Sequence, residues 1–255
     1  MLAADIESLE RATLAAVPPR ALEELGGWLL GFDAGTVDRA HSAVPLRHQA
    51  PAPGTVGRIV QRYAAQGLAA VLRVPRVGCF DALRSEIEAG GWRAGKPTLT
   101  QTGSAAALAR LPGDDRRDAG LAEFEVVLRS SIDDDWAAVF LGAGFDPVDG
   151  ASRLEILGRS RDTLFASVRV QGEVVAVGSA CFACSWVGVH GMRTAPGWRR
   201  RGAAAHILSA FGREGQARSV ERVFLQVEEA NAGAQRLYSR AGLQTAWTYA
   251  YWQLV

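Results

Sequence analysis

The sequence predicts a mixed α+β / α/β fold built as two similar domains in tandem, each with a mixed central sheet flanked by helices. Three observations lead to this prediction. Expected helices and strands alternate through the second half of the chain, an order typical of sheets covered by helices. Segments 55–102 and 201–254 repeat one order of elements: helix, glycine, strand, helix, glycine turn, strand. Between the halves, residues 103–120 are rich in Ala and then in polar turn-forming residues, which is typical of a linker.

Periodicity and turn residues predict the elements of the first half. Apolar side chains at helical spacing end at Pro18 and Pro19, and this pattern predicts a first helix before the two prolines. The expected elements are a helix at 3–17, strands at 28–32 and 36–44 around a turn at 33–35, a loop at 48–54, a helix at 55–66, a strand at 68–74, a helix at 80–89 and a strand at 92–102.

The second half gives a longer series by the same criteria. Acidic residues at the start of the expected helix at 133–143 are favourable for its dipole. The expected elements are strands at 122–129, two within 161–184 and one at 186–194, a helix at 199–215, a strand at 220–227, a helix at 231–241 and a strand at 243–254. We therefore expect one domain at residues 1–112 and a second domain at residues 113–255.

Composition excludes several classes of function. The formal net charge is +1, so the chain has no broad electrostatic footprint for nucleic acid or for an anionic membrane. No run of about 18 apolar residues is present, and the acidic residues 1–10 do not resemble a signal peptide. Three cysteines do not make a disulfide framework. These features predict a cytoplasmic protein. Lys96 is the only lysine among 28 basic side chains, a bias that we attribute mainly to coding composition.

The most informative stretch is residues 187–205, where an apolar strand ends near Thr194 and a Pro-Gly turn leads into a helix. The start of a helix offers main-chain N–H groups without partners and the positive end of the dipole, and both favour a phosphate. Gly202 has no Cβ, so a ligand can approach the main chain closely, and Ala203 and Ala204 leave the next turn uncrowded. Arg199–Arg201 add positive charge at the rim.

A second stretch, residues 225–243, places Asn231, Ala234 and Tyr238 on one face of a helix, while Leu237 is expected to point toward a core. Such a stripe could line a narrow channel. Taken alone, Asn231 reads as a helix N-cap and Tyr238 as a half-buried aromatic residue.

Together, the two stretches resemble the GCN5-related N-acetyltransferase (GNAT) superfamily. The resemblance rests on the pattern Arg-x-x-Gly-x-Ala at 199–204 and on Asn-x-x-Ala-x-x-Leu-Tyr-x-x-x-Gly-Leu at 231–243. It covers residues 122–255. The first half, with Gly-Trp-Leu-Leu at 27–30 and Arg-Ala-x-Ser-Ala at 39–43, looks like the degenerate first copy of bacterial tandem members. It lacks a counterpart of the 199–204 pattern, so we expect no cofactor there.

The resemblance implies transfer of an acetyl group from acetyl-CoA to a primary amine. Main-chain N–H groups would hold the CoA pyrophosphate, and the pantetheine would pair with the strand that ends at Thr194, in a cleft between this strand and residues 223–227. Gly188 and Gly191 would suit a bulge in that strand, and an N–H near Met192 would stabilise the oxyanion. The expected cofactor-binding residues are Met192, Arg193, Thr194, Arg199, Arg200, Arg201, Gly202, Ala203, Ala204, Asn231, Ala234 and Tyr238.

Two proton transfers need side chains. Tyr238 matches the family position of the general acid for the departing thiolate. The acceptor ammonium must first lose a proton, and Glu228 at the end of one strand and His190 on its neighbour are the candidate bases. Glu229 is expected to be a solvated neighbour. The sequence leaves open which amine is the acceptor, whether a small molecule or a protein or peptide amine, and whether the protein is a monomer or a homodimer.

Alternative functions would require other sequence features. A non-catalytic CoA-binding or interaction module would share the phosphate site, and only an assay separates it from an enzyme. A mononucleotide- or dinucleotide-binding domain would use the same strand, loop and helix, but Gly-x-Gly-x-x-Gly and its acidic partner are missing. Cys181 and Cys184 have the spacing of half a zinc site without a second pair, so no metal is expected. Arg199–Arg201 beside Trp198 are a poor footprint for nucleic acid.

Overall fold

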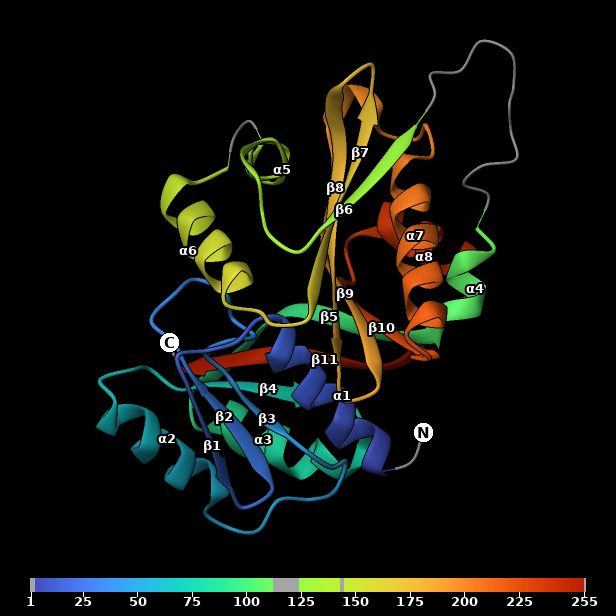
Figure 1. Ribbon diagram of the computed structural model, residues 1–255. Helices are drawn as coiled ribbons and strands as arrows, with labels where there is room; N and C mark the ends of the chain where they lie inside the picture. Colours follow the sequence, from blue (N-terminus) through green and yellow to red (C-terminus); the bar gives the residue numbers. More distant parts are fainter. Residues whose placement is uncertain (1–2, 112–123, 143–144, 255) are drawn as a thin grey trace.

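Across the described residues, one mixed sheet of eleven strands runs through both halves of the chain (Figure 1). The computed structural model describes residues 3–111, 124–142 and 145–254. The elements of the first half are α1 (Ala3–Ala16), β1 (Ala21–Leu25), β2 (Trp28–Phe32), β3 (Ala43–Pro45), α2 (Thr55–Ala65), β4 (Val71–Pro75), α3 (Asp81–Ala89), β5 (Trp92–Ser104) and α4 (Ala105–Ala109). Those of the second half are β6 (Glu125–Arg129), α5 (Asp134–Leu141), α6 (Pro147–Gly158), β7 (Thr163–Val170), β8 (Glu173–Ala183), β9 (Trp186–Thr194), α7 (Ala203–Ala217), β10 (Arg222–Glu228), α8 (Ala232–Arg240) and β11 (Gln244–Leu254).

Local sequence explains where several helices begin. Asp133, Asp146 and Asn231 each precede a helix, and each side chain accepts a hydrogen bond from a main-chain N–H of the first turn. Such caps satisfy one of the N–H groups that a helix start leaves without an acceptor. In α2, an apolar stripe buries Ile59 and Tyr63 against the sheet.

The sheet has the strand order β1-β2-β3-β4-β11-β5-β10-β9-β8-β7-β6. The last strand of each half lies beside the inner strand of the other half: β11 pairs with β4, β5 pairs with β10, and β11 and β5 pair with each other, all antiparallel. Outward from this central pair, β3 and β4 are parallel in one half, and β9 and β10 are parallel in the other. The two halves are therefore arranged with approximate symmetry, and they exchange their last strands.

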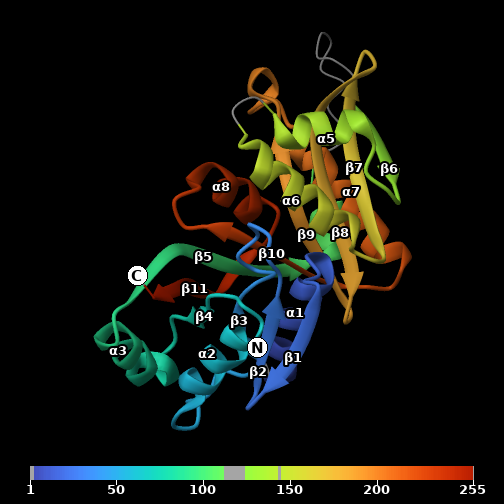
Figure 2. The ribbon, with the colours of Figure 1, turned by 90° about the vertical axis from the view of Figure 1, so that its left-hand side faces the viewer.

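Helices cover both faces of the sheet (Figures 1 and 2). On one face, which we call the α7 face, α4, α7 and α8 pack on the strands of the second half, and α2 and α3 pack on those of the first half. On the other face, the α1 face, α1 packs at the junction of the halves, and α5 and α6 cover β7 and β8. The side chain of Tyr238 belongs to the α7 face and that of Phe224 to the α1 face.

The predicted mixed fold of helices and sheet is confirmed, with local differences. The structure adds β1 and α6, which the sequence patterns did not predict, and the expected strand at 36–44 is reduced to β3. Helix α7 begins at Ala203 rather than at residue 199, because Arg199 is extended and Arg200 and Gly202 have positive φ angles. The expected linker at 103–120 begins instead with the end of β5 and with α4, which packs on α7.

The rest of that segment, residues 112–123, lies outside the described residues, and so does the expected boundary between the two domains. The division into domains therefore stays a prediction. Among the described residues, no helix is long and apolar enough to span a membrane.

Candidate active site

Strands β9 and β10 separate from each other halfway along their length. They are paired in parallel from Arg222↔Trp186 to Leu225↔Val189. Beyond this point, β9 continues to Thr194 paired with β8, and β10 continues to Glu228 paired with β5. The main-chain edges of the two strands that face each other after Val189 and Leu225 are therefore not paired across this junction, and they can hydrogen-bond to a ligand.

A β-bulge marks the point where the strands separate. Ser179 is opposite His190 and Val177 is opposite Arg193, so a single residue of β8 faces both Gly191 and Met192 of β9. Gly191 has a φ angle of 61°, a conformation that favours glycine. The bulge expected in this strand is thus present, at Gly191 and Met192. Gly188 lies before it, in the paired part of the strand.

The start of α7 follows directly from the end of β9. Gly202 is the N-cap with a φ angle of 98°, and it has no side chain to close the first turn. Its carbonyl accepts hydrogen bonds from the N–H groups of Ala205 at 2.8 Å and His206 at 3.3 Å. The N–H groups of Ala203 and Ala204 precede these first helical donors, so they have no acceptor within the helix. Arg200 also has a positive φ of 63°, and alternation of this kind curves main-chain N–H groups toward an anion.

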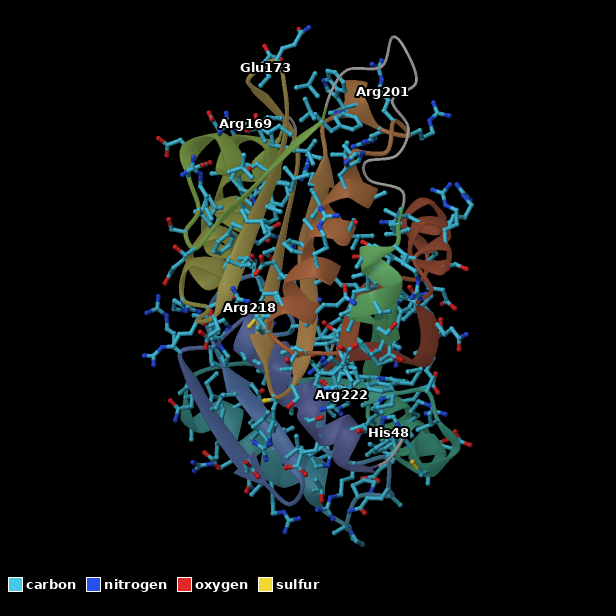
Figure 3. All side chains as sticks on the ribbon, turned by 45° about the vertical axis from the view of Figure 1, so that its right-hand side comes forward. His48, Arg169, Glu173, Arg201, Arg218 and Arg222 are labelled. Atoms are coloured by element: carbon cyan, nitrogen blue, oxygen red, sulfur yellow. The ribbon has the colours of Figure 1, made fainter. Side chains whose placement is uncertain are left out.

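Space is available at this turn. Among the described residues, a Cβ added at Gly202 would have one neighbour within 4 Å, Cε2 of Phe124 at 3.9 Å. A ligand can therefore reach the main chain here. The guanidinium of Arg201 stacks 4.9 Å from the ring of Trp198, and Nε of Arg199 donates to the carbonyl of Thr194 at 3.3 Å. Figure 3 shows Arg201 at the end of the molecule that carries Glu173, the first residue of β8, away from Arg222.

Helix α8 brings the second motif to the α7 face of β10. The Asn231 side chain caps the helix, its Oδ1 accepting a hydrogen bond from the N–H of Ala234 at 3.1 Å. Ala234 is partly buried against the core of the α7 face. Tyr238 is 8% exposed, and burial raises the pKa of its phenol to about 12. Leu237 packs against this core, as expected, but it is only partly buried and Tyr238 is the more buried of the two side chains.

The two candidate bases lie on the α1 face of the separating strands. His190 is 6% exposed with its ring 5.7 Å from that of Phe224, and neither ring nitrogen has a hydrogen-bond partner among the described residues. Burial lowers the pKa of His190 to about 3, and the positive charge of Arg39 adds to this effect. Glu228 ends β10, opposite Thr98 of β5, and is exposed. The neighbouring Glu229 is 3.5 Å from Arg76, and both side chains are largely solvated.

The sequence-predicted residues fall into two groups around the point where the strands separate. The residues expected to bind the cofactor line the bulge of β9, the start of α7 and the α7-face side of α8. His190 and Glu228 lie on the opposite face. The side chain of Arg193 also points to that face, where its guanidinium lies 4.9 Å from the Phe145 ring. Arg193 can therefore contribute only main-chain groups to a site on the α7 face.

The sequence analysis gave no role in the site to Arg39 or Gln226. Arg39 lies between β2 and β3, and its Nη1 donates to Oε1 of Gln226 on β10 at 3.1 Å. The contact joins residues 187 positions apart, so no local pattern predicts it. Gln226 could have been noticed as a polar side chain within the apolar strand 223–227.

Comparisons with known proteins bear on this arrangement. The sequence model of one protein family, described as the C-terminal region of the probable histone acetyltransferase Rv0428c, matches residues 3–252. That match covers nearly the whole chain. The chain belongs to this acetyltransferase family. Curated proteins gave no match.

Several solved structures with a similar fold are described as GNAT proteins. A GCN5-related N-acetyltransferase from Kribbella flavida has a TM-score of 0.72 at 16% identity, covering 97% of this chain and 95% of that one. A tandem GNAT protein from the clavulanic acid biosynthesis pathway has a TM-score of 0.60 at 14% identity, covering 98% and 96%. A putative GNAT acetyltransferase from Novosphingobium aromaticivorans has a TM-score of 0.55 at 22% identity, covering 97% and 99%. At these identities the likeness shows the fold. The predicted tandem GNAT fold is thus confirmed.

The first half of the chain has a related but simpler turn. Gly54 precedes α2 with a φ angle of 74°, as Gly202 precedes α7. The residues before Gly54 are Ala50-Pro-Ala-Pro53, whereas three arginines precede Gly202. A hollow of about 270 Å³ lined by Trp28, Arg47 and Pro51 lies near this turn. It is a feature of the first half, separate from the point where β9 and β10 part.

The three cysteines of the chain are free thiols. Cys181 is buried in β8, and Cys184 is exposed in the turn before β9, where it has a positive φ angle. Within the described ranges, no group of three His, Cys, Asp or Glu side chains is placed to hold a metal ion.

Proposed function

We propose that the protein is an acetyl-CoA-dependent N-acetyltransferase that transfers the acetyl group to a primary amine by direct attack on the thioester. The observation that supports this proposal best is the separation of β9 and β10 beside the start of α7. This arrangement combines unpaired strand edges with a cluster of main-chain N–H groups. An extended chain with a pyrophosphate at one end, such as CoA, needs both features.

The residues of the α7 face would bind the cosubstrate. Main-chain N–H groups of residues 199–204 would hold the pyrophosphate, with the arginine side chains adding positive charge. The edge of β9 at Met192–Thr194 would pair with the pantetheine, and an N–H near Met192 would stabilise the oxyanion that forms at the thioester carbonyl. Asn231 is occupied as a helix cap through its oxygen, so its amide nitrogen is the group available to the pantetheine.

Proton transfer would use side chains on both faces. Tyr238 on the α7 face would hydrogen-bond to the departing thiolate. Of the two candidate bases, Glu228 fits better than His190. A pKa of about 3 makes the His190 imidazole a weak acceptor for the proton of an ammonium group. Glu228 is exposed at the end of β10, where it can act through water. His190 would then shape the site as a neutral ring.

Other parts of the proposal rest on the sequence alone. They are a degenerate first domain at residues 1–112, a catalytic domain at 113–255, a cytoplasmic location and a monomeric or homodimeric state. The symmetric arrangement around the central pair of strands supports an origin by duplication.

The test measures acetyl-CoA binding by calorimetry and thiol release with a panel of primary amines. Gly202→Glu should abolish acetyl-CoA binding, because it places a side chain and a negative charge at the pyrophosphate turn and requires a φ angle of 98° from a residue with a Cβ. Gly197→Ala is the matched control, since a Cβ there has open space and the φ angle is ordinary. Undiminished binding by the Gly202 variant would exclude this cosubstrate site. Binding without transfer to any amine would favour a non-catalytic CoA-binding module.

A further inference from the structure

Arg39 belongs to the first half of the chain, and its side chain contacts the α1 face of the candidate active site. It extends from the segment between β2 and β3 and donates from Nη1 to Oε1 of Gln226, 3.1 Å away on β10. Gln226 comes directly after Leu225, the last residue of β10 that pairs with β9. Arg39 is half-buried. Its guanidinium is therefore held beside the point where the two strands separate.

The charge of Arg39 has no counter-ion among the residues that the structure describes. Its hydrogen-bond partner is a neutral amide, and the ion pairs of the described segments do not include Arg39. The two carboxylates nearest in sequence are engaged elsewhere. Asp38 pairs with Lys96, and Asp33 pairs with Arg159 at 2.5 Å. Half-buried arginines are usually paired with a carboxylate or phosphate, because removing the charge from water is costly without one. An unpaired guanidinium at this position is a binding group for an anion.

Buried polar atoms without partners surround the same point. They are both ring nitrogens of His190, Nε2 of Gln226 and Oγ1 of Thr100. Thr100 is directly opposite Gln226 in the antiparallel β5–β10 pair, so the two side chains share the α1 face. Buried polar groups are normally hydrogen-bonded, and a cluster of unpartnered ones indicates a ligand or water between them. This observation is independent of the charge of Arg39, and it points to the same place.

A carboxylate lies on the same face, one pleat further along β10. Glu228 follows Gln226 by two residues, so both side chains point to the α1 face. It is exposed and has no ion pair among the described residues. The face where β9 and β10 part thus presents a cation and an anion without partners, separated by about two residues of strand. A ligand that carries both an ammonium and an anionic group complements this pair.

We propose that the acceptor of this acetyltransferase is an amine that carries a carboxylate, as amino acids do, and that Arg39 binds the carboxylate. The inference rests on the proposed function, since it takes Glu228 as the group that receives the ammonium. It gives the first half a role, because Arg39 supplies acceptor recognition to a reaction whose cosubstrate is bound by the second half. Gln226 positions the guanidinium, and His190 and Thr100 offer additional hydrogen bonds.

The test uses pairs of amines that differ only in the carboxylate. The probes are L-phenylalanine with 2-phenylethylamine, L-lysine with 1,5-diaminopentane, and a peptide with an internal lysine and blocked ends. Binding of each probe is measured by calorimetry on the full chain with saturating CoA, and turnover is measured with acetyl-CoA.

The variants are Arg39→Gln, Arg39→Lys, which keeps the charge, and Arg58→Gln. Arg58 is an exposed arginine of the same half, hydrogen-bonded to the Thr55 hydroxyl, and serves as the matched control. Unfolding midpoints check that each variant is folded.

The expected result is tighter binding of at least one carboxylated probe than of its carboxylate-free partner, by about tenfold or more, the scale of a hydrogen bond to a charged group. Arg39→Gln should remove this preference and leave CoA binding and the carboxylate-free probes unchanged. Arg39→Lys should keep part of it, and Arg58→Gln all of it. Any one of four results would overturn the proposal. They are equal affinity within every pair of amines, a preference for the carboxylate that survives in Arg39→Gln, tighter binding of the blocked peptide than of the carboxylated probes, and no binding of any carboxylated probe. An Arg39-dependent preference without any acetyl transfer would instead remove the proposed function and retain the anion site.

Discussion

At the residue scale, the protonation of Tyr238 limits what it can do. Burial raises the pKa of its phenol to about 12, whereas an ordinary thiol has a pKa of about 8.5. Complete transfer of the phenolic proton to a departing thiolate is therefore unfavourable. A hydrogen bond from the phenol to the developing negative charge needs no such transfer, and it is strengthened by the burial of Tyr238. Tyr238 is better described as a hydrogen-bond donor that remains protonated at neutral pH.

Tyr238→Phe should accordingly lower kcat by about 10- to 100-fold, the range of a hydrogen bond to a charged group, and leave the affinity for acetyl-CoA unchanged. Thiol release under saturating substrates measures the first quantity, and calorimetry measures the second. Tyr63→Phe is the control, because Tyr63 is another buried tyrosine whose hydroxyl donates to the carbonyl of Gly31, in the core of the first half. A kcat within twofold of the wild type in Tyr238→Phe would exclude this role.

Single residues also show what the sequence can predict of a site. Gly202 and Asn231 were predictable, because a glycine before a helix and a capping side chain act on main-chain groups close in sequence. The relative burial of Leu237 and Tyr238 was not, because it depends on how α8 rotates against β10. The Arg39–Gln226 contact was beyond any local pattern, since it requires the two halves to meet.

At the scale of elements, a buried ion pair connects α1 to the sheet. Glu10 of α1 and Arg73 of β4 are 2.6 Å apart, and both side chains are at most 2% exposed. Burial raises the pKa of Glu10, and the charge of Arg73 opposes this effect. The guanidinium also lies 5.3 Å from the ring of Tyr249 on β11. One helix of the first half is thereby linked to a strand of each half.

Glu10→Gln should destabilise the protein by about 3–5 kcal/mol, because it leaves the Arg73 charge buried without a counter-ion. The double variant Glu10→Met/Arg73→Met should recover most of this loss, since it removes both charges and retains apolar volume. Urea unfolding gives the free energies. Glu23→Gln, which breaks the exposed pair with Arg62, is the control and should change stability little. The expectation fails if Glu10→Gln costs no more than the control.

Most elements followed from sequence periodicity, and the exceptions have physical reasons. Strand β1 has the exposed pattern of an edge, with Glu23 and Glu24 in it, so it lacks the apolar alternation of a half-buried strand. The start of α7 was placed four residues early because Arg199–Arg201 are good helix formers. Their main chain instead forms the turn before Gly202. The helix propensity of the three arginines is therefore outweighed by the turn geometry at residues 200–202, which is the geometry that the candidate phosphate site needs.

At the scale of the whole molecule, the exchange of last strands makes the two halves depend on each other. Strand β11 fills the place between β4 and β5, and β5 fills the place between β11 and β10. Local sequence could predict each of these strands but not its neighbour, because strand order is set by contacts between residues far apart in the chain. The repeat of segments 55–102 and 201–254 suggested two separate sheets. The structure joins them into one.

This arrangement predicts that neither half folds alone. A fragment of residues 1–111 would lack the strand between β4 and β5, and a fragment of residues 112–255 would leave β10 without β5 and β11 without either of its neighbours. Unpaired strand edges and the exposed apolar residues of α1 and β11 favour unfolding or aggregation. Each fragment expressed alone should show no cooperative urea transition by circular dichroism. The two fragments expressed together should form a one-to-one complex that unfolds cooperatively, as the intact chain does.

The intact chain should unfold in one transition. The fluorescence of Trp28 in the first half and of Trp136 in the second, observed separately in single-tryptophan variants, should change at one midpoint. A cooperative transition in isolated 112–255, or two separated midpoints in the intact chain, would show that the second half is an autonomous domain. Arg39 could then act only as a ligand-binding group, with no part in the stability of the second half.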